Sequence, residues 1–113
     1  EGWGLPEFQS VAIGKHAVLM NAHSYKDWAN EENACLFNPS GKIPAYDNMF
    51  FKEGQDINQG NIFDFNVDHF IDACERAVER VKSQKENTKG LELQQKFSVD
   101  KFYENIKSLY ASL

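Results

Sequence analysis

The sequence predicts an α/β fold in which helices cover a small parallel sheet. Two segments, His16–Met20 and Ala34–Phe37, form almost continuous apolar runs, which are typical of strands that are covered on both faces. Apolar residues recur at helical spacing before the first run and again after the second. The chain has 113 residues, which is the length of one domain.

Composition excludes several classes of protein. With 12 Lys and Arg against 17 Asp and Glu, the net charge is −5, which argues against a nucleic-acid binder that neutralises phosphates. The apolar fraction of 42% is too high for a disordered chain. No apolar run approaches the roughly 18 residues that a membrane span needs. We therefore expect a globular domain with no nucleic-acid partner and no transmembrane segment.

The cysteines and the lack of visible secretory or glycosylation signals predict the cellular compartment. Cys35 and Cys74 lie far apart in apolar surroundings without the short paired spacing of zinc or redox sites, so we expect buried free thiols. Pro39 follows Asn38 and removes the glycosylation signal, and no secretory signal is visible. The sequence therefore predicts a cytoplasmic protein. Because the chain starts at Glu1, within a predicted loop, we expect it to be a piece of a longer protein.

The first predicted helix spans Pro6–Ile13. Proline suits the first turn of a helix, where its missing N–H is harmless. Gly14 stands where a left-handed C-terminal cap is expected. The strand His16–Met20 follows, then a polar loop with one helical turn near Trp28, and then the strand Ala34–Phe37.

The second half of the chain is predicted to be mainly helical. Asn38–Gly41 should form a turn that ends the second strand, and 42–60 should be an insertion that forms a long loop or a short hairpin. Three helices should follow, with Asp72 and Arg76 paired on the solvent side of the first. Their predicted bounds are from the Asn66 cap to about Lys85, from Leu91 to Phe97, and from the Ser98 cap to the chain end.

The opening loop predicts an anion site. Gly2 and Gly4 lead directly into the helix, whose first backbone N–H groups have no intrahelical acceptor and whose dipole favours negative charge. Phosphate or diphosphate fits such a site. Glu1 and Gln9 are placed so that both could hold the hydroxyls of a ligand over the helix start. The plainer interpretation is an ordinary helix start flanked by two surface side chains.

These residues resemble a known signature. Glu1–Pro6, followed by Gln9, Ala12, Gly14 and a strand, is similar to the donor-site motif Glu-Gly-Phe-Gly-Leu-Pro of retaining glycosyltransferases of the GT-B fold, the glycosyl transferase group 1 type. The segment Asn33–Pro39 resembles the short strand Gly-Leu-Leu-Val-Asp-Pro of that family. The two longer predicted helices resemble its closing pair, whereas 42–60 has no counterpart.

The resemblance implies the C-terminal portion of a Rossmann-like, parallel-sheet lobe. In it, 1–97 is the C-terminal half of the nucleotide-sugar-binding lobe, and 98–113 is a closing helix that packs on the N-terminal lobe of the same protein. The implied reaction transfers a sugar from a nucleotide-diphosphate sugar to a glycan, lipid or protein acceptor with retention of configuration. Neither a metal nor a cofactor is implied.

The family's residue roles carry over only at matching positions. Glu1 takes the catalytic position, and Gly2, Trp3, Gly4, Leu5 and Gln9 take donor-binding positions. Gln9 departs from the motif, because the family has a glutamate there that binds the ribose hydroxyls, and an amide oxygen accepts more weakly than a carboxylate. The alternative is a non-catalytic α/β interaction or nucleotide-binding domain, in which the glycine loop is only a turn and the last helix is a docking surface.

Overall fold

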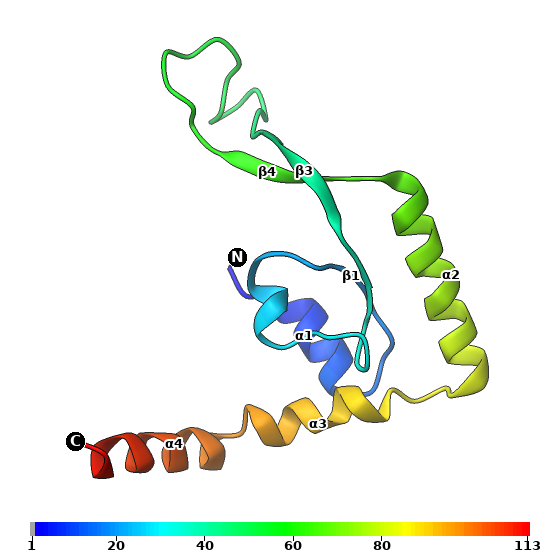
Figure 1. Ribbon diagram of the computed structural model, residues 1–113, viewed down its shortest axis with the longest axis vertical. Helices are drawn as coiled ribbons and strands as arrows, with labels where there is room; N and C mark the ends of the chain where they lie inside the picture. The colour runs from blue at the N-terminus through cyan, green and yellow to red at the C-terminus, as the bar shows by residue number, and fades with distance from the viewer. Residues whose placement is uncertain (1) are drawn as a thin grey trace.

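The structure is a computed structural model that describes residues 2–113. Within these residues the chain forms helices, one 3-10 helix and two small two-stranded sheets (Figure 1). In chain order the elements are α1 (Leu5–Ala12), β1 (Val18–Met20), η1 (His23–Asp27), β2 (Cys35–Phe37), β3 (Pro39–Pro44), β4 (Asn61–Phe65), α2 (Val67–Ser83), α3 (Thr88–Lys96) and α4 (Val99–Ala111).

The predicted α/β class and the parallel pairing of its two strands are confirmed. β1 and β2 run parallel, with Val18 opposite Cys35 and Met20 opposite Phe37. Both strands are shorter than predicted, because His16 and Ala17 lead into β1 without entering it and Ala34 precedes β2. The remaining pair, β3 and β4, is antiparallel and forms a separate sheet.

The predicted turn at Asn38–Gly41 is wrong. Pro39 instead begins β3, which pairs with β4 through a register shift between Pro39 and Gly41. Proline is tolerated at the first residue of a strand and glycine at a bulge, so both residues fit a strand start as well as a turn. A hairpin therefore leaves the carboxyl end of β2 and projects away from the rest of the molecule (Figure 1), with 45–60 as its end loop.

The hydrophobic core lies between the parallel pair, α1 and α3. Trp28 is its largest fully buried side chain, and Phe8 packs edge-on against it with ring centroids 5.4 Å apart. The half-buried rings of Trp3 and Tyr25 pack on the outside of this cluster. Its buried members are Val11, Ala12, Leu19, Trp28, Ala34, Leu36 and Leu93.

Polar caps set the helix boundaries, most of them at the predicted residues. The Asn66 side chain accepts hydrogen bonds from the backbone N–H groups of Asp68 and His69, and Ser98 accepts one from Lys101. Gly14 has the expected left-handed conformation with a φ of 86°. α3 begins earlier than predicted, because the buried Asn87 caps it through the backbone N–H of Gly90.

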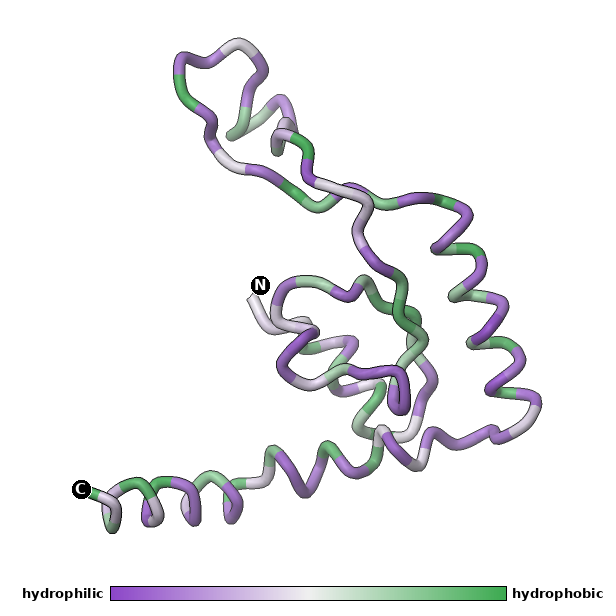
Figure 2. The backbone as a smooth tube through the Cα atoms, viewed as in Figure 1, coloured by the Kyte–Doolittle hydropathy of each residue, from purple (hydrophilic) through white to green (hydrophobic). Residues whose placement is uncertain are grey.

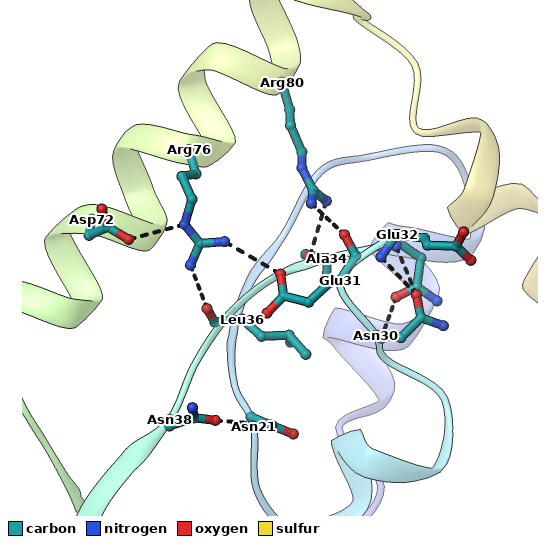
Figure 3. Close-up of polar contacts among 11 residues, drawn as sticks. Asn21, Asn30, Glu31, Glu32, Ala34, Leu36, Asn38, Asp72, Arg76 and Arg80 are labelled. Atoms are coloured by element: carbon teal, nitrogen blue, oxygen red, sulfur yellow. Dashed lines mark hydrogen bonds and ion pairs between the residues drawn. The ribbon is translucent and has the colours of Figure 1, made fainter.

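The arginines of α2 hold this helix against β2, which corrects the predicted solvent position of Arg76. Arg76 does pair with Asp72 at 3.1 Å, but its guanidinium also donates to the Leu36 carbonyl oxygen (Figure 3). Arg80 donates to the carbonyl oxygens of Ala34 and Glu31. Other apolar side chains of α2 are exposed, among them Val67, Ile71, Val78 and Val81.

Among the described residues, no helix combines the length and the apolar character that crossing a membrane requires.

Candidate functional site

A hollow of about 400 Å³ lies at the start of α1. One side is formed by the opening loop and the first turn of the helix, and the other by the first residues of η1. The chain brings these two segments together because Tyr25 packs on the same core as the residues of α1. The lining residues are Gly2, Gly4, Pro6, Glu7, His23, Ser24 and Tyr25.

Gly4 shapes the narrow side of this hollow. It is the N-cap of α1 with φ 77° and ψ 49°, a left-handed conformation that an L side chain rarely adopts. A Cβ atom at this position would also collide with the Tyr25 ring. The Gly4 carbonyl oxygen accepts the first helical hydrogen bond, from Phe8 N–H, at 2.8 Å. Glycine is thus required here both for its backbone conformation and for the close approach of the tyrosine.

Gly2, in contrast, leaves space in the hollow. No heavy atom lies within 4 Å of the position that a Cβ atom of Gly2 would occupy. The glycine therefore serves no packing purpose visible in the described residues.

The charges around the hollow are mixed. The start of α1 carries the positive end of the helix dipole, and Gly4 caps it without a side-chain hydrogen bond. Ser24 and His23 add a hydroxyl and an imidazole, which can donate to an anion or to a sugar hydroxyl. Glu7, in the first turn, adds a carboxylate that repels an anion but accepts hydrogen bonds from hydroxyls. The lining suits a ligand that has both a negative group and hydroxyl groups.

His23 joins the hollow to the β3–β4 hairpin. Its backbone has a positive φ of 53°, and its ring stands edge-on to Phe63 with the centroids 4.6 Å apart. Phe63 belongs to β4, so the base of the hairpin rests beside the hollow. Positive φ at a non-glycine residue is uncommon and is often found at functional sites.

The structure brings together only some of the predicted site residues. Gly2 and Gly4 line the hollow, whereas Trp3 turns to the aromatic cluster, with its ring centroid 6.0 Å from Phe8 and 5.7 Å from Phe97. The exposed Leu5 and Gln9 are not among the lining residues. Glu1, the predicted catalytic residue, lies outside the described residues. The donor-binding roles of Trp3, Leu5 and Gln9 remain predictions.

Sequence reasoning missed the other side of the hollow. Glu7, His23, Ser24 and Tyr25 carry no motif in the sequence. Their role depends on η1 folding back beside α1, which no local pattern predicts. Glu7 could have been found, since an acidic residue in the first turn of a helix faces the same end as the cap.

The remaining titratable candidates are explained by packing. His16 hydrogen-bonds the Gln84 carbonyl oxygen at 2.8 Å. Cys35 is fully buried and free, and burial raises the pKa of its thiol, which keeps it protonated and unreactive. Among residues 2–113, no group of three or more His, Cys, Asp and Glu side chains is arranged to hold a metal ion.

Comparison of the chain with protein-family models, with curated proteins and with solved structures found no match.

Proposed function

We propose that this chain is the C-terminal part of the nucleotide-sugar-binding lobe of a retaining GT-B glycosyltransferase, with the hollow at the start of α1 as its diphosphate site. The observation that carries the proposal is the arrangement of Gly2–Pro6. Gly2 and Gly4 border a hollow at the positive end of a helix, and a Cβ atom at Gly2 would meet no heavy atom within 4 Å.

The chemistry of such a site is the departure of the donor's leaving group. The bond between the anomeric carbon of the sugar and the diphosphate oxygen breaks, the nucleoside diphosphate leaves with the bonding electrons, and an acceptor hydroxyl forms the new bond as it loses its proton. Backbone N–H groups and the helix dipole at the start of α1 stabilise the charge that grows on the diphosphate. Same-face attack, which gives retention, follows from the family resemblance.

The side chains around the hollow have roles that fit this substrate. Ser24 and His23 lie opposite the glycines and would donate to the diphosphate or to the sugar. Glu7 would accept hydrogen bonds from sugar or ribose hydroxyls, a task for which Gln9 is less suited. Glu1 keeps its proposed place beside the donor sugar, and a cytoplasmic location remains part of the proposal.

Calorimetric titration with uridine, guanosine and adenosine diphosphates tests the proposal. At least one of them should bind to the wild-type protein. Gly2→Leu should abolish that binding without loss of stability, because the leucine enters an open space that the ligand needs. Gly41→Leu, where a Cβ atom also meets nothing within 4 Å but which lies in β3, is the matched control and should bind normally.

The alternative is a non-catalytic interaction domain, which predicts no heat from any nucleotide. Hydrolysis of a panel of nucleotide sugars separates a transferase from a protein that only binds the nucleotide. For a transferase, Glu1→Ala should lower the hydrolysis rate. Unchanged binding in Gly2→Leu, or no binding by the wild type, would refute the diphosphate site.

A further inference from the structure

Two helices of this chain carry long apolar stripes that are exposed. The α2 stripe consists of Val67, Ile71, Cys74, Val78 and Val81. The α4 stripe consists of Val99, Phe102, Ile106, Leu109 and Leu113, the last of which lies just beyond the end of the helix at Ala111. Cys74 is half-buried, and the exposed fraction of the other nine side chains is 47% or more. Single exposed apolar residues are normal, but two continuous stripes of this length indicate contact surfaces.

The spacing of both stripes suits a helix as the partner. Steps of three and four residues alternate along each stripe, which is the repeat that lets one helix insert its side chains between those of another. Within the helices, the α2 stripe runs from Val67 to Val81 and the α4 stripe from Val99 to Leu109. The α2 stripe is therefore long enough to cover the whole helical part of the α4 stripe.

Side-chain size favours a contact between unlike stripes. The α2 stripe is built from Val, Ile and Cys, whereas the α4 stripe contains Phe102 and Leu109 and is widened by Tyr103 and Tyr110. Large side chains pack best against small ones across a helix contact. Two α4 stripes facing each other would bring large residues together, and two α2 stripes would leave gaps.

Charge is compatible with the same pairing. Asp68, Glu75 and Lys82 flank the α2 stripe at steps of seven residues, with Glu79 close by. The positions that flank the α4 stripe are Tyr103, Asn105 and Tyr110, and the nearby Lys107 lies over the Tyr103 ring. Because the flanking positions of the α4 stripe are uncharged, a contact between the stripes places hydroxyl and amide groups beside the charges of α2 and brings no like charges together at the flanks.

Within one copy the two stripes do not meet. α3 packs against α1, and Phe97 at its end is fixed by ring contacts with Trp3 and Phe8, so α4 points away from the body. Figure 1 shows α2 and α4 on opposite sides of the molecule, and Figure 2 shows hydrophobic residues along both helices. None of the extensive element contacts among residues 2–113 involves α4.

We propose that two copies of this chain form a dimer in which α4 of each copy packs on the α2 stripe of the other. The exchange closes with two-fold symmetry, so both stripes of both copies are covered. If each stripe side chain loses roughly 80 Å² of surface, the ten in one copy bury about 800 Å², the size of a standard interface. A dimer with only one contact between an α4 stripe and an α2 stripe would bury half of that area.

Sedimentation velocity of the wild-type chain and of three variants tests the dimer. The wild type should sediment with twice the 13.0 kDa mass of one chain. Val78→Glu and Leu109→Glu each place a charge inside one stripe and should weaken association about a hundredfold. Ser108→Glu adds the same charge to α4 outside the stripe and should remain dimeric. Circular dichroism confirms that each variant keeps its helices.

A mixing experiment distinguishes the exchange from other dimers. Val78→Glu retains an intact α4 stripe and Leu109→Glu an intact α2 stripe, so a mixture of these two variants regains one good contact and should associate more strongly than either alone. A dimer formed through α4 alone would be unaffected by Val78→Glu, and mixing the two variants would not strengthen association. A monomeric wild type at about 100 µM, or a dimer unaffected by either variant, would also overturn the proposal. The proposal assigns α4 to a second copy, in place of the N-terminal lobe that the family resemblance implies for 98–113, and it does not depend on nucleotide binding.

Discussion

Two features of the structure require glycine at position 4. Its backbone is left-handed, and the Tyr25 ring packs where a side chain would begin. Gly54 has almost the same φ, 81° against 77°, but a Cβ atom there would meet nothing within 4 Å. We expect Gly54→Ala to lower the free energy of unfolding by about 1 kcal/mol, from backbone strain alone. Gly4→Ala should lower it by about 2–4 kcal/mol, because the Tyr25 ring must also move.

Urea unfolding followed by circular dichroism measures both losses. The difference between the two variants isolates the contact with Tyr25 from the cost of the backbone conformation. Equal losses in the two variants would show that the tyrosine ring gives way freely, and that the narrow side of the hollow is not fixed by Gly4.

Asp47 organises the end loop of the hairpin in a pH-dependent way. One of its carboxylate oxygens accepts hydrogen bonds from the backbone N–H groups of Met49, Phe50 and Phe51 at 2.8, 2.9 and 2.9 Å. These donors hold the pKa of this carboxyl below its usual range. Because the folded pKa is the lower one, the contribution to loop order is present above the unfolded pKa and is lost as pH falls through the folded pKa.

The expected result is a loop that loosens only in acid. The amide resonances of Met49, Phe50 and Phe51 should shift together as pH falls below about 4, at the same midpoint as the carboxyl carbon of Asp47. Asp47→Asn should remove this common transition from the three resonances. Nuclear magnetic resonance titration provides the measurement, and a transition that survives in the variant would assign it to another group.

At the scale of elements, the contact between α1 and α3 depends on the missing side chain of Gly90. A Cβ atom at Gly90 would collide with the Val11 carbonyl oxygen and lie 2.9 Å from both Val11 Cγ1 and Asn87 Nδ2. The two helices thus approach closely at this glycine. The buried Asn87 secures the approach, since its amide donates to the carbonyl oxygens of Lys15 at 3.0 Å and Asn33 at 2.8 Å.

We therefore expect Gly90→Ala to destabilise the protein, although replacing glycine by alanine within a helix is usually stabilising. In an exposed helix this change stabilises by about 1 kcal/mol through helix propensity. Here it should lower the free energy of unfolding by about 1–3 kcal/mol, because Val11 belongs to the core and α1 must shift. Thermal and urea unfolding measure the sign. Lys89→Ala, at the exposed neighbouring position, is the control, and a stabilised Gly90→Ala variant would contradict the close packing.

The elements that sequence predicted well are those whose ends carry their own caps. Asn66 and Ser98 determine the starts of α2 and α4 by local hydrogen bonds, and so they could be predicted from short patterns. α3 was predicted to start too late, because its cap Asn87 is held in place by the carbonyl oxygens of Lys15 and Asn33, which are distant in the sequence. Arg76 was misplaced because its partner, the Leu36 carbonyl oxygen, is distant in the sequence.

At the scale of the whole molecule, one side of the hollow follows from a local sequence pattern, whereas the other side depends on contacts between segments distant in the sequence. The glycines Gly2 and Gly4 could be predicted from the motif that contains them. His23 and Ser24 come beside them only because Tyr25 packs on the core, a tertiary contact with no local signature. A short hairpin within 42–60 was one of two predicted alternatives, but its strands at Pro39–Pro44 and Asn61–Phe65 were missed, because Pro39 and Gly41 fit a turn as well as a strand with a bulge.

The stability of the whole chain should depend on its concentration. The parallel sheet has only two strands, too few for independent stability without covering elements, and α2 and α4 leave their apolar stripes exposed in a single copy. If two copies cover these stripes, folding is coupled to association, and mass action makes the melting temperature rise with protein concentration.

Over a hundredfold range of concentration we expect the melting temperature to rise by several degrees, since each tenfold step in concentration supplies about 1.4 kcal/mol at most. Differential scanning calorimetry measures it, and Leu109→Glu, whose association should be about a hundredfold weaker, should melt at a lower temperature than the wild type at every concentration. A sharp, concentration-independent transition of the wild type would mean that one copy is stable alone, with its apolar stripes in water.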